Sequence, residues 1–257
     1  MTVLGVPIVL DGQLALAALA VFAGGLLRGF AGFGSALVMV PVLALVFGPR
    51  AAVVMHAIVE IPVIASLLPS AIRDSRAATI RPMLVALAVT TPLGALALKL
   101  ADPELMKLAI SVVVLVMVGV IAAGGRLAFL AGTRGAALGG AVGGLIQGST
   151  GVGGPPVAAA LLARGEPAAA TRANVVAVMS AMIGLSLGIF ALYGLIDRQA
   201  LVIGLLAAPV CVLGTWAGSA AFARGGGRGH RAVALGMIAI TATATTAGSV
   251  GALLGRG

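Results

Sequence analysis

The chain has 257 residues, of which 61% are hydrophobic and only 9% are charged, and its formal net charge is +9. Soluble domains carry roughly 25% charged residues, so this composition excludes a separate soluble domain. Apolar runs that approach the length of a bilayer-spanning helix, about 20 residues, recur along the whole sequence. We therefore predict an all-α polytopic membrane protein whose basic loops fix its topology, and we do not expect nucleic acid as a partner.

Two short apolar runs come first, Leu14–Leu27 and Ser35–Phe47, of about 13 or 14 residues each. Each is too short to cross a bilayer alone, so we predict two half-helices that form a re-entrant hairpin. Three segments long enough to cross follow, at about Ala51–Ala71, Pro82–Leu100 and Leu105–Ala123.

The second half repeats this order. Two short runs, Ala136–Gln147 and Pro155–Ala163, precede spans at about Thr171–Leu195, Ala200–Phe222 and Val233–Leu254. We divide the chain into two membrane repeats, residues 1–124 and 125–257, within one integral membrane domain.

A glycine-rich break separates the two short runs of each half. A shift of 119 positions aligns Gly25, Gly29, Gly32 and Gly34 with Gly144, Gly148, Gly151 and Gly153. Glycine-interrupted segments at corresponding positions of two halves are the best sequence pointer to a transporter's binding site. The alternative is that these glycines only let helices pack closely in the membrane.

The charges of the loops predict opposite orientations for the two halves. Basic residues dominate the loop at Arg76 in the first half and the loop at Arg228 in the second. Charges balance in the loops at Lys99 and Arg198. Because basic loops face the cytoplasm, equivalent loops lie on opposite sides. We predict inverted repeats, with Arg76 and Arg228 inside and Lys99 and Arg198 outside.

Each break opens into a short helix, and a helix N-terminus attracts anions through its free N–H groups and partial positive charge. Inverted repeats would aim two such ends at one central point. The predicted substrate-binding residues are Arg28, Gly32, Gly34, Ser35, Gln147, Ser149, Thr150, Gly151, Gly153 and Asn174. Arg28 could bind an anion bidentately, or its side chain could snorkel to the membrane surface.

His56 and Glu60 are four residues apart and so share one helix face. Glu60 is the only acidic residue within any predicted span. An ionisable residue inside the membrane is a functional hypothesis by default, so we predict that this pair couples transport to protons. The alternative is a structural pair whose members satisfy each other. The sequence predicts no catalytic residues, no metal site and no cofactor.

At these residues the chain resembles the sulfite exporter TauE/SafE family of membrane permeases. The resemblance rests on Gly29-Phe-Ala-Gly-Phe-Gly-Ser with Gly48-Pro49-Arg50, and on Gly148-Ser-Thr-Gly-Val-Gly-Gly-Pro-Pro with Pro167 and Thr171-Arg172-Ala173-Asn174. It covers nearly the whole chain. It implies a secondary carrier of small organic or sulfur-containing anions, such as sulfite, sulfonates or organosulfur carboxylates, in a bacterial inner membrane. Family members usually have a small hydroxyl residue where this chain has His56, so the resemblance implies no role for it.

We therefore expect a proton- or ion-coupled anion permease, not an enzyme, whose partners are the substrate anion, the coupling ion and the lipid bilayer. Its oligomeric state is not predicted. One rival is an uncoupled, channel-like anion facilitator, against which the titratable pair argues. Another is a membrane assembly protein without transport, against which the matched breaks argue.

Overall fold

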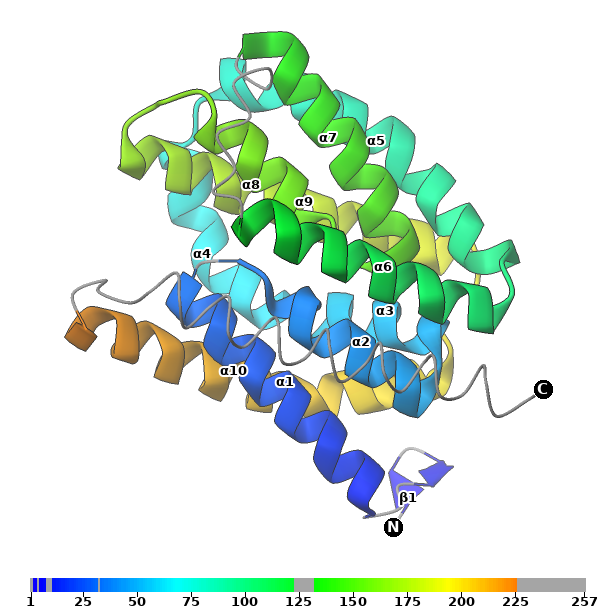
Figure 1. Cartoon of the computed structure of the whole chain (residues 1–257). Helices are drawn as coiled ribbons and strands as arrows, with labels where there is room; N and C mark the ends of the chain where they lie inside the picture. Colours follow the sequence, from blue (N-terminus) through cyan, green and yellow to red (C-terminus); the bar gives the residue numbers. More distant parts are fainter. Residues whose placement is uncertain (1, 4, 8–10, 32, 123–131, 226–257) are drawn as a thin grey trace.

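A computed structural model describes residues 2–3, 5–7, 11–31, 33–122 and 132–225 of the chain (Figure 1). The described part is almost entirely helical, and five of its helices are long and apolar enough to cross a membrane. The predicted all-α membrane fold is thus confirmed. The helices are α1 (Gly12–Ala31), α2 (Ser35–Phe47), α3 (Pro49–Val59), α4 (Ile61–Asp74), α5 (Ala77–Leu100), α6 (Pro103–Ala122), α7 (Gly132–Thr150), α8 (Gly154–Leu162), α9 (Ala168–Leu192) and α10 (Arg198–Gly225).

A small hairpin near the N-terminus is the one non-helical element of the described residues. Its strands, β1 (Thr2–Val3) and β2 (Val6–Pro7), pair antiparallel. The turn between them lies against the guanidinium of Arg198 at the start of α10.

The first arm of each break is longer than the sequence predicted. α1 has 20 residues and α7 has 19, whereas the second arms, α2 and α8, have 13 and 9. The prediction of two half-helices per break is therefore corrected, because the first arm approaches or reaches spanning length. Glycines inside α1 and α7 do not end these helices, and Gly25, Gly29, Gly140 and Gly148 lie against the backbone of a neighbouring helix.

The predicted span Ala51–Ala71 is divided into α3 and α4 at Glu60. Pro62 follows two residues later, and a proline has no N–H group to donate to the carbonyl four residues before it. The helical hydrogen-bond pattern is therefore interrupted beside the one acidic residue that the sequence places in a span, while Pro49–Pro69 as a whole is long and apolar enough to cross a membrane. The predicted span Val233–Leu254 lies outside the described residues.

The long arms pack in corresponding ways on the other half's helices. α1 lies along α10 and α7 lies along α5, and both pairs are parallel. Gly29 faces the backbone carbonyl of Thr215, and Gly148 faces that of Thr91. Each threonine hydroxyl donates to the carbonyl four residues earlier in its own helix. Equivalent contacts thus relate α1 to α7 by a shift of 119 and α5 to α10 by a shift of 124.

Side-chain contacts mark the two ends of the bundle. At one end Arg50 donates to the carbonyl of Leu98, and the ammonium of Lys99 lies 5.8 Å from the centre of the Tyr193 ring, close to the start of α10 at Arg198. Arg76 lies at the opposite end, where α5 begins. The inverted-repeat arrangement and the side that faces the cytoplasm stay predictions, and Arg228 lies outside the described residues.

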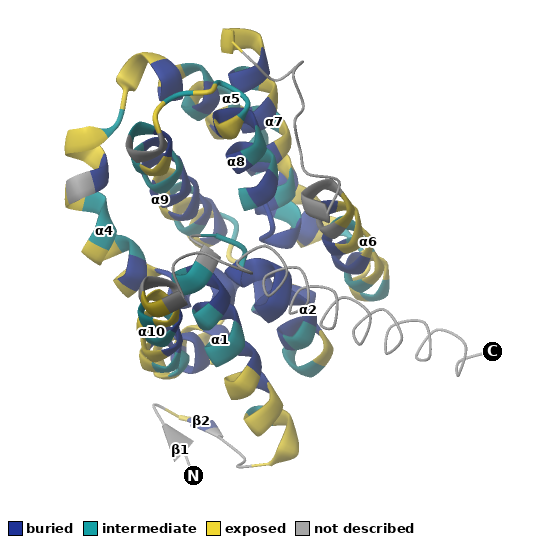
Figure 2. Cartoon of the chain, turned by 60° about the vertical axis from the view of Figure 1, so that its left-hand side comes forward, coloured by how far each residue is buried: buried dark blue, intermediate teal, exposed yellow. Residues whose placement is uncertain are grey.

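One hydrophobic core lies around α2 and α3, and a second lies between α5, α7, α8 and α9; Figure 2 shows α2 mostly buried. Leu37, Met39, Leu43 and Met55 are fully buried in the first core. Large apolar side chains on the outer helices are exposed instead: Leu100, Leu192, Leu213 and Trp216. Outward apolar side chains on helices of spanning length fit a lipid surround.

Candidate functional site

The first break brings the start of α2 into the core. Gly34 precedes α2 with φ of 94°, a left-handed conformation that favours glycine. Ser35, the first residue of α2, is buried. No side chain of α2's own turn caps this N-terminus. Gly32, a predicted site residue, lies outside the described residues.

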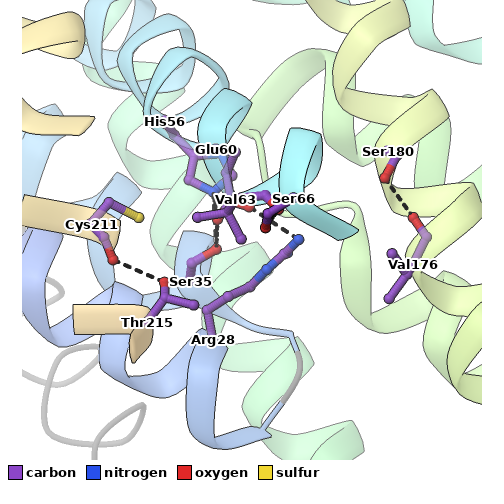
Figure 3. Close-up of polar contacts among 10 residues, drawn as sticks. All are labelled: Arg28, Ser35, His56, Glu60, Val63, Ser66, Val176, Ser180, Cys211 and Thr215. Carbon is purple, nitrogen blue, oxygen red and sulfur yellow. Dashed lines mark hydrogen bonds and ion pairs between the residues drawn. The ribbon is translucent and has the colours of Figure 1, made fainter. Parts of the chain in front are cut away.

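Four predicted site residues from three parts of the chain meet at this N-terminus (Figure 3). Arg28 of α1 places Nη2 3.1 Å from Oε2 of Glu60. Ser35 Oγ donates to Oε1 of Glu60 over 2.5 Å and lies 3.3 Å from Nε2 of His56. His56 Nε2 is 3.8 Å from Glu60 Oε1, as their shared helix face predicts. We call Arg28, Ser35, His56 and Glu60 the central cluster.

The central cluster is closed to solvent. The side chains of Arg28 and Glu60 are 7% and 0% exposed. Arg28 and Glu60 are close enough to form a salt bridge. Oε2 of Glu60 nevertheless has no hydrogen-bond partner within the described residues, so the guanidinium is not aligned for a hydrogen bond to it. Buried charges need such pairing. Arg28 therefore does not snorkel to the surface. It points into the protein and compensates the carboxylate.

The second break approaches the same place from the other half. Gly151 ends α7 with φ of 73°, and a Cβ atom there would lie 3.8 Å from Nδ1 of His56. That nitrogen has no hydrogen-bond partner among the described residues. Gln147, which the repeat aligns with Arg28, accepts a hydrogen bond from the N–H of Gly153 through Oε1, while its Nε2 is buried without a partner in the described part of the chain.

Three predicted residues of the second break make local contacts instead. The Ser149 hydroxyl donates to the carbonyl of Leu145, and the Thr150 hydroxyl donates to that of Ile146. Both hydroxyl protons are thus used within α7. A Cβ atom on Gly153 would overlap the carbonyl of Gly143, so this glycine allows α7 and α8 to pack closely.

Asn174 lies in a second polar group at one end of the bundle. Its amide donates to Oε2 of Glu166 over 2.9 Å and accepts from the N–H of Arg76 over 2.7 Å. Oε1 of Glu166 accepts from the hydroxyl of Thr79 over 2.7 Å and from Nε of Arg164 over 3.4 Å. These contacts tie the α8–α9 loop of one half to the start of α5 in the other. We call this group the end cluster.

The hydrogen bond from Thr79 lowers the pKa of Glu166, and Arg164 contributes through a weaker hydrogen bond and its charge. Desolvation acts in the opposite direction without prevailing. Glu166 is therefore ionised and acts as an acceptor at neutral pH. Sequence reasoning missed this residue because it lies in a loop, where a single carboxylate beside Pro167 gives no pattern.

The predicted residues thus fall into separate groups. Arg28, Ser35, His56 and Glu60 meet directly, and Gly151 approaches His56 from the second half. Gln147 and Gly153 contact each other beside α8. The structure gives Asn174 partners in the end cluster, so its predicted place in a substrate site has no support from its contacts. Within the described residues no three His, Cys, Asp or Glu side chains are grouped as metal ligands.

Comparison with known proteins gives one relationship. A search of curated proteins and a search of solved structures returned no match. A family model described as sulfite exporter TauE/SafE matches residues 16–245, which cover nearly all of the chain and both breaks. The chain is therefore an integral membrane protein of the transporter class and belongs to the sulfite exporter TauE/SafE family.

Proposed function

We propose that this protein is a proton-coupled carrier of small sulfur-containing or organic anions, such as sulfite, sulfonates or organosulfur carboxylates, in a bacterial inner membrane. The observation that carries the proposal is the buried pair of Arg28 and Glu60 at the first break. A charged pair sealed inside a membrane helix bundle is expensive to maintain and marks transport pathways. Well-packed hydrophobic residues in place of Arg28 and Glu60 would stabilise the fold as well as the ion pair or better, so stability alone does not explain the pair.

The central cluster has the chemistry that an oxyanion needs. The guanidinium of Arg28 supplies a permanent positive charge and a planar fork of donors. The Ser35 hydroxyl and the N-terminus of α2 supply further donors and a partial positive charge. Gly151 has no side chain of its own, so its backbone can approach an anion bound near His56 closely. We leave Ser149 and Thr150 out of this site, since their protons are already donated within α7.

Coupling to protons follows from the cost of moving charge. Moving one uncompensated charge across a membrane gains or costs about 2.3 kcal/mol for each 100 mV of membrane potential, depending on the direction. A proton taken up with a monovalent anion cancels that charge. Glu60 is the acidic group in contact with the anion-binding side chains, and His56 on the same face is placed to relay or tune its proton.

The helix directions support an alternating-access mechanism by inverted repeats. α3 begins at the end of the bundle where α5 finishes, and α9 begins at the opposite end. This pair, which the repeat predicts to be equivalent, therefore runs in opposite directions, as inverted repeats would require. The end cluster joins the halves at one end, and Lys99 with Tyr193 joins them at the other.

Transport into reconstituted vesicles tests the proposal. With an imposed pH gradient, wild-type protein should accumulate sulfite and a sulfonate above the equilibrium level. Glu60→Gln should lose this accumulation while exchange of labelled for unlabelled substrate survives. Accumulation that ignores the pH gradient in the wild type would favour an uncoupled facilitator. Absence of any anion flux would favour the non-transporting alternative.

A further inference from the structure

The carboxylate of Glu60 occupies the position that a bound anion would take. Its two oxygens are held separately, Oε1 by the hydroxyl of Ser35 at 2.5 Å and Oε2 by the guanidinium of Arg28 at 3.1 Å. The start of α2 lies beside it, and the group is fully buried. These are the contacts that a protein gives to a small oxyanion ligand.

The charges around this position leave room for one negative group. Among the described residues, the titratable groups around Glu60 are Arg28 from α1, His56 from α3 and Cys211 from α10 (Figure 3). Arg28 is the only permanent cation among them. Two anionic groups against one guanidinium would leave an uncompensated buried charge, and two neighbouring carboxylates in one site cannot both stay ionised for the same reason.

We propose that Glu60 is an internal competitor of the substrate: the carboxylate and the transported oxyanion take turns on Arg28 and Ser35. This inference rests on the proposed function and adds the mechanism of its coupling. When a proton from water binds Glu60, the carboxylate releases the guanidinium, and the anion takes its place. The site stays neutral whether it holds the pair Arg28–Glu60 or a monoanion beside protonated Glu60.

The geometry also defines the class of substrate. Since Ser35 and Arg28 hold two oxygens of one carboxyl group, the matching ligand carries at least two oxygens on one central atom. Carboxylates, sulfonates and hydrogen sulfite have this arrangement, whereas a spherical halide does not. Within the described residues Arg28 uses one nitrogen for its one ion pair, so its remaining donors allow a bidentate contact to such a ligand.

Proton uptake during binding tests the competition directly. Purified wild-type protein in weakly buffered detergent solution is titrated with methanesulfonate, which keeps a single charge near neutral pH. We expect uptake of about one proton for each anion bound, and an affinity that rises up to about tenfold for each unit that the pH falls. Chloride should bind far more weakly. Binding without proton uptake would overturn the inference and leave the proposed function standing.

Two variants sharpen this test. Glu60→Gln removes the competitor, so it should bind methanesulfonate at neutral pH at least as tightly as the wild type, with no proton uptake and no pH dependence. Adding Arg28→Gln to that variant removes the cation without leaving an unpaired buried charge, and binding should be lost. Glu166→Gln, a carboxylate change in the end cluster, should keep the wild-type proton uptake.

The outcomes separate the two proposals. If Glu60→Gln binds more weakly than the wild type and keeps its pH dependence, Glu60 is a direct ligand or a structural group, and the competition is wrong. If neither methanesulfonate nor sulfite binds the wild type, the proposed function fails and the inference fails with it. Should Glu60→Gln fail to fold, proton uptake by the wild type alone still decides the question.

Discussion

The two breaks of this protein share a backbone design and differ in chemistry. In each, a long helix rests through glycines on a helix of the other half, turns at a left-handed glycine and continues as a short helix. The first break is charged, with Arg28 against Glu60. The second is neutral, with the Gln147 amide against the N–H of Gly153.

This difference separates the residues that build the fold from those that carry charge. Gly25, Gly29, Gly144 and Gly148 recur in register and each lies against a neighbouring backbone, whereas Gly34 and Gly151 are the positions with positive φ. The ionisable residues do not recur. Under the shift that aligns His56 with Asn174, Glu60 corresponds to Val178, and Glu166 corresponds to Gly48. Glu60 and Glu166 therefore have no carboxylate at the corresponding position of the other half, and they lie at different depths of the bundle.

The largest effect is expected where the halves are alike. A Cβ atom at Gly148 would overlap the carbonyl of Thr91, and one at Gly29 would overlap that of Thr215. Backbone cannot yield as a side chain can, so Gly148→Val and Gly29→Val should each cost more than the roughly 1–3 kcal/mol of ordinary overpacking. We expect both variants to lose the folded, monodisperse species in detergent chromatography.

A glycine without neighbours provides the control. Gly188 of α9 has open space around its Cβ position, and Gly188→Val should leave folding close to wild type. If Gly148→Val folds normally while Gly29→Val does not, the contacts of α1 with α10 and of α7 with α5 are not equivalent, and the shared backbone design of the two breaks is contradicted.

The next effect is expected where the halves differ. Arg28→Gln leaves Glu60 without its cation, and breaking a buried pair in this way costs roughly 3–5 kcal/mol. Gln147→Ala leaves one buried N–H without its acceptor, at a cost of about 1–3 kcal/mol. Combining Arg28→Gln with Glu60→Gln should recover most of the lost stability. Thermal unfolding of the solubilised variants measures this order, and equal losses for Arg28→Gln and Gln147→Ala would contradict it.

A smaller and pH-dependent effect is expected at the end cluster. The pKa of Glu166 is lowered in the folded protein, chiefly by the hydrogen bond from Thr79. Because the pKa of Glu166 is lower in the folded protein, its contribution to stability is complete above the pKa of the unfolded chain, 4.5. That contribution is lost as the pH falls through the pKa of the folded protein. Glu166→Gln should therefore lower stability by about 1 kcal/mol at neutral pH. The difference from wild type should shrink as the pH falls from 4.5 through the lowered pKa of Glu166 in the folded state, and a constant difference would show that the charge is irrelevant.

The sequence predicted the features that depend on local pattern. The glycine register, the membrane helices and the shared face of His56 and Glu60 all follow from spacing along one chain segment, and the structure places them accordingly. The interruption of the helix at Glu60 could also have been predicted from the sequence, because Pro62, two residues later, is sufficient to cause it.

The contacts between distant segments were not predictable in the same way. Arg28 and Glu60 lie on different helices, and nothing in their spacing distinguishes an ion pair from two separate groups. The end cluster depends on two loops from different halves meeting, which is set by the packing of α5 and α9. Asn174 is an example: the repeat aligns it with His56, but its hydrogen-bond partners are Arg76 and Glu166, and its place in the substrate site stays a prediction.

The smallest effect is expected at the hydroxyls beside the second break. Ser149 and Thr150 were predicted to hold the anion, yet each donates its proton to a carbonyl one turn earlier in α7. Such back-bonding slightly destabilises a helix, so Ser149→Ala and Thr150→Ala should change stability by no more than about 0.5 kcal/mol and leave transport near the wild-type rate. Ser35→Ala is the contrast, because that hydroxyl donates to the buried carboxylate of Glu60 and its loss should alter the pH dependence of transport. Initial rates in vesicles at several pH values compare the three variants. A strong loss of transport in Thr150→Ala with normal stability would return the second break to the substrate site and make the two halves chemically more alike than their contacts indicate.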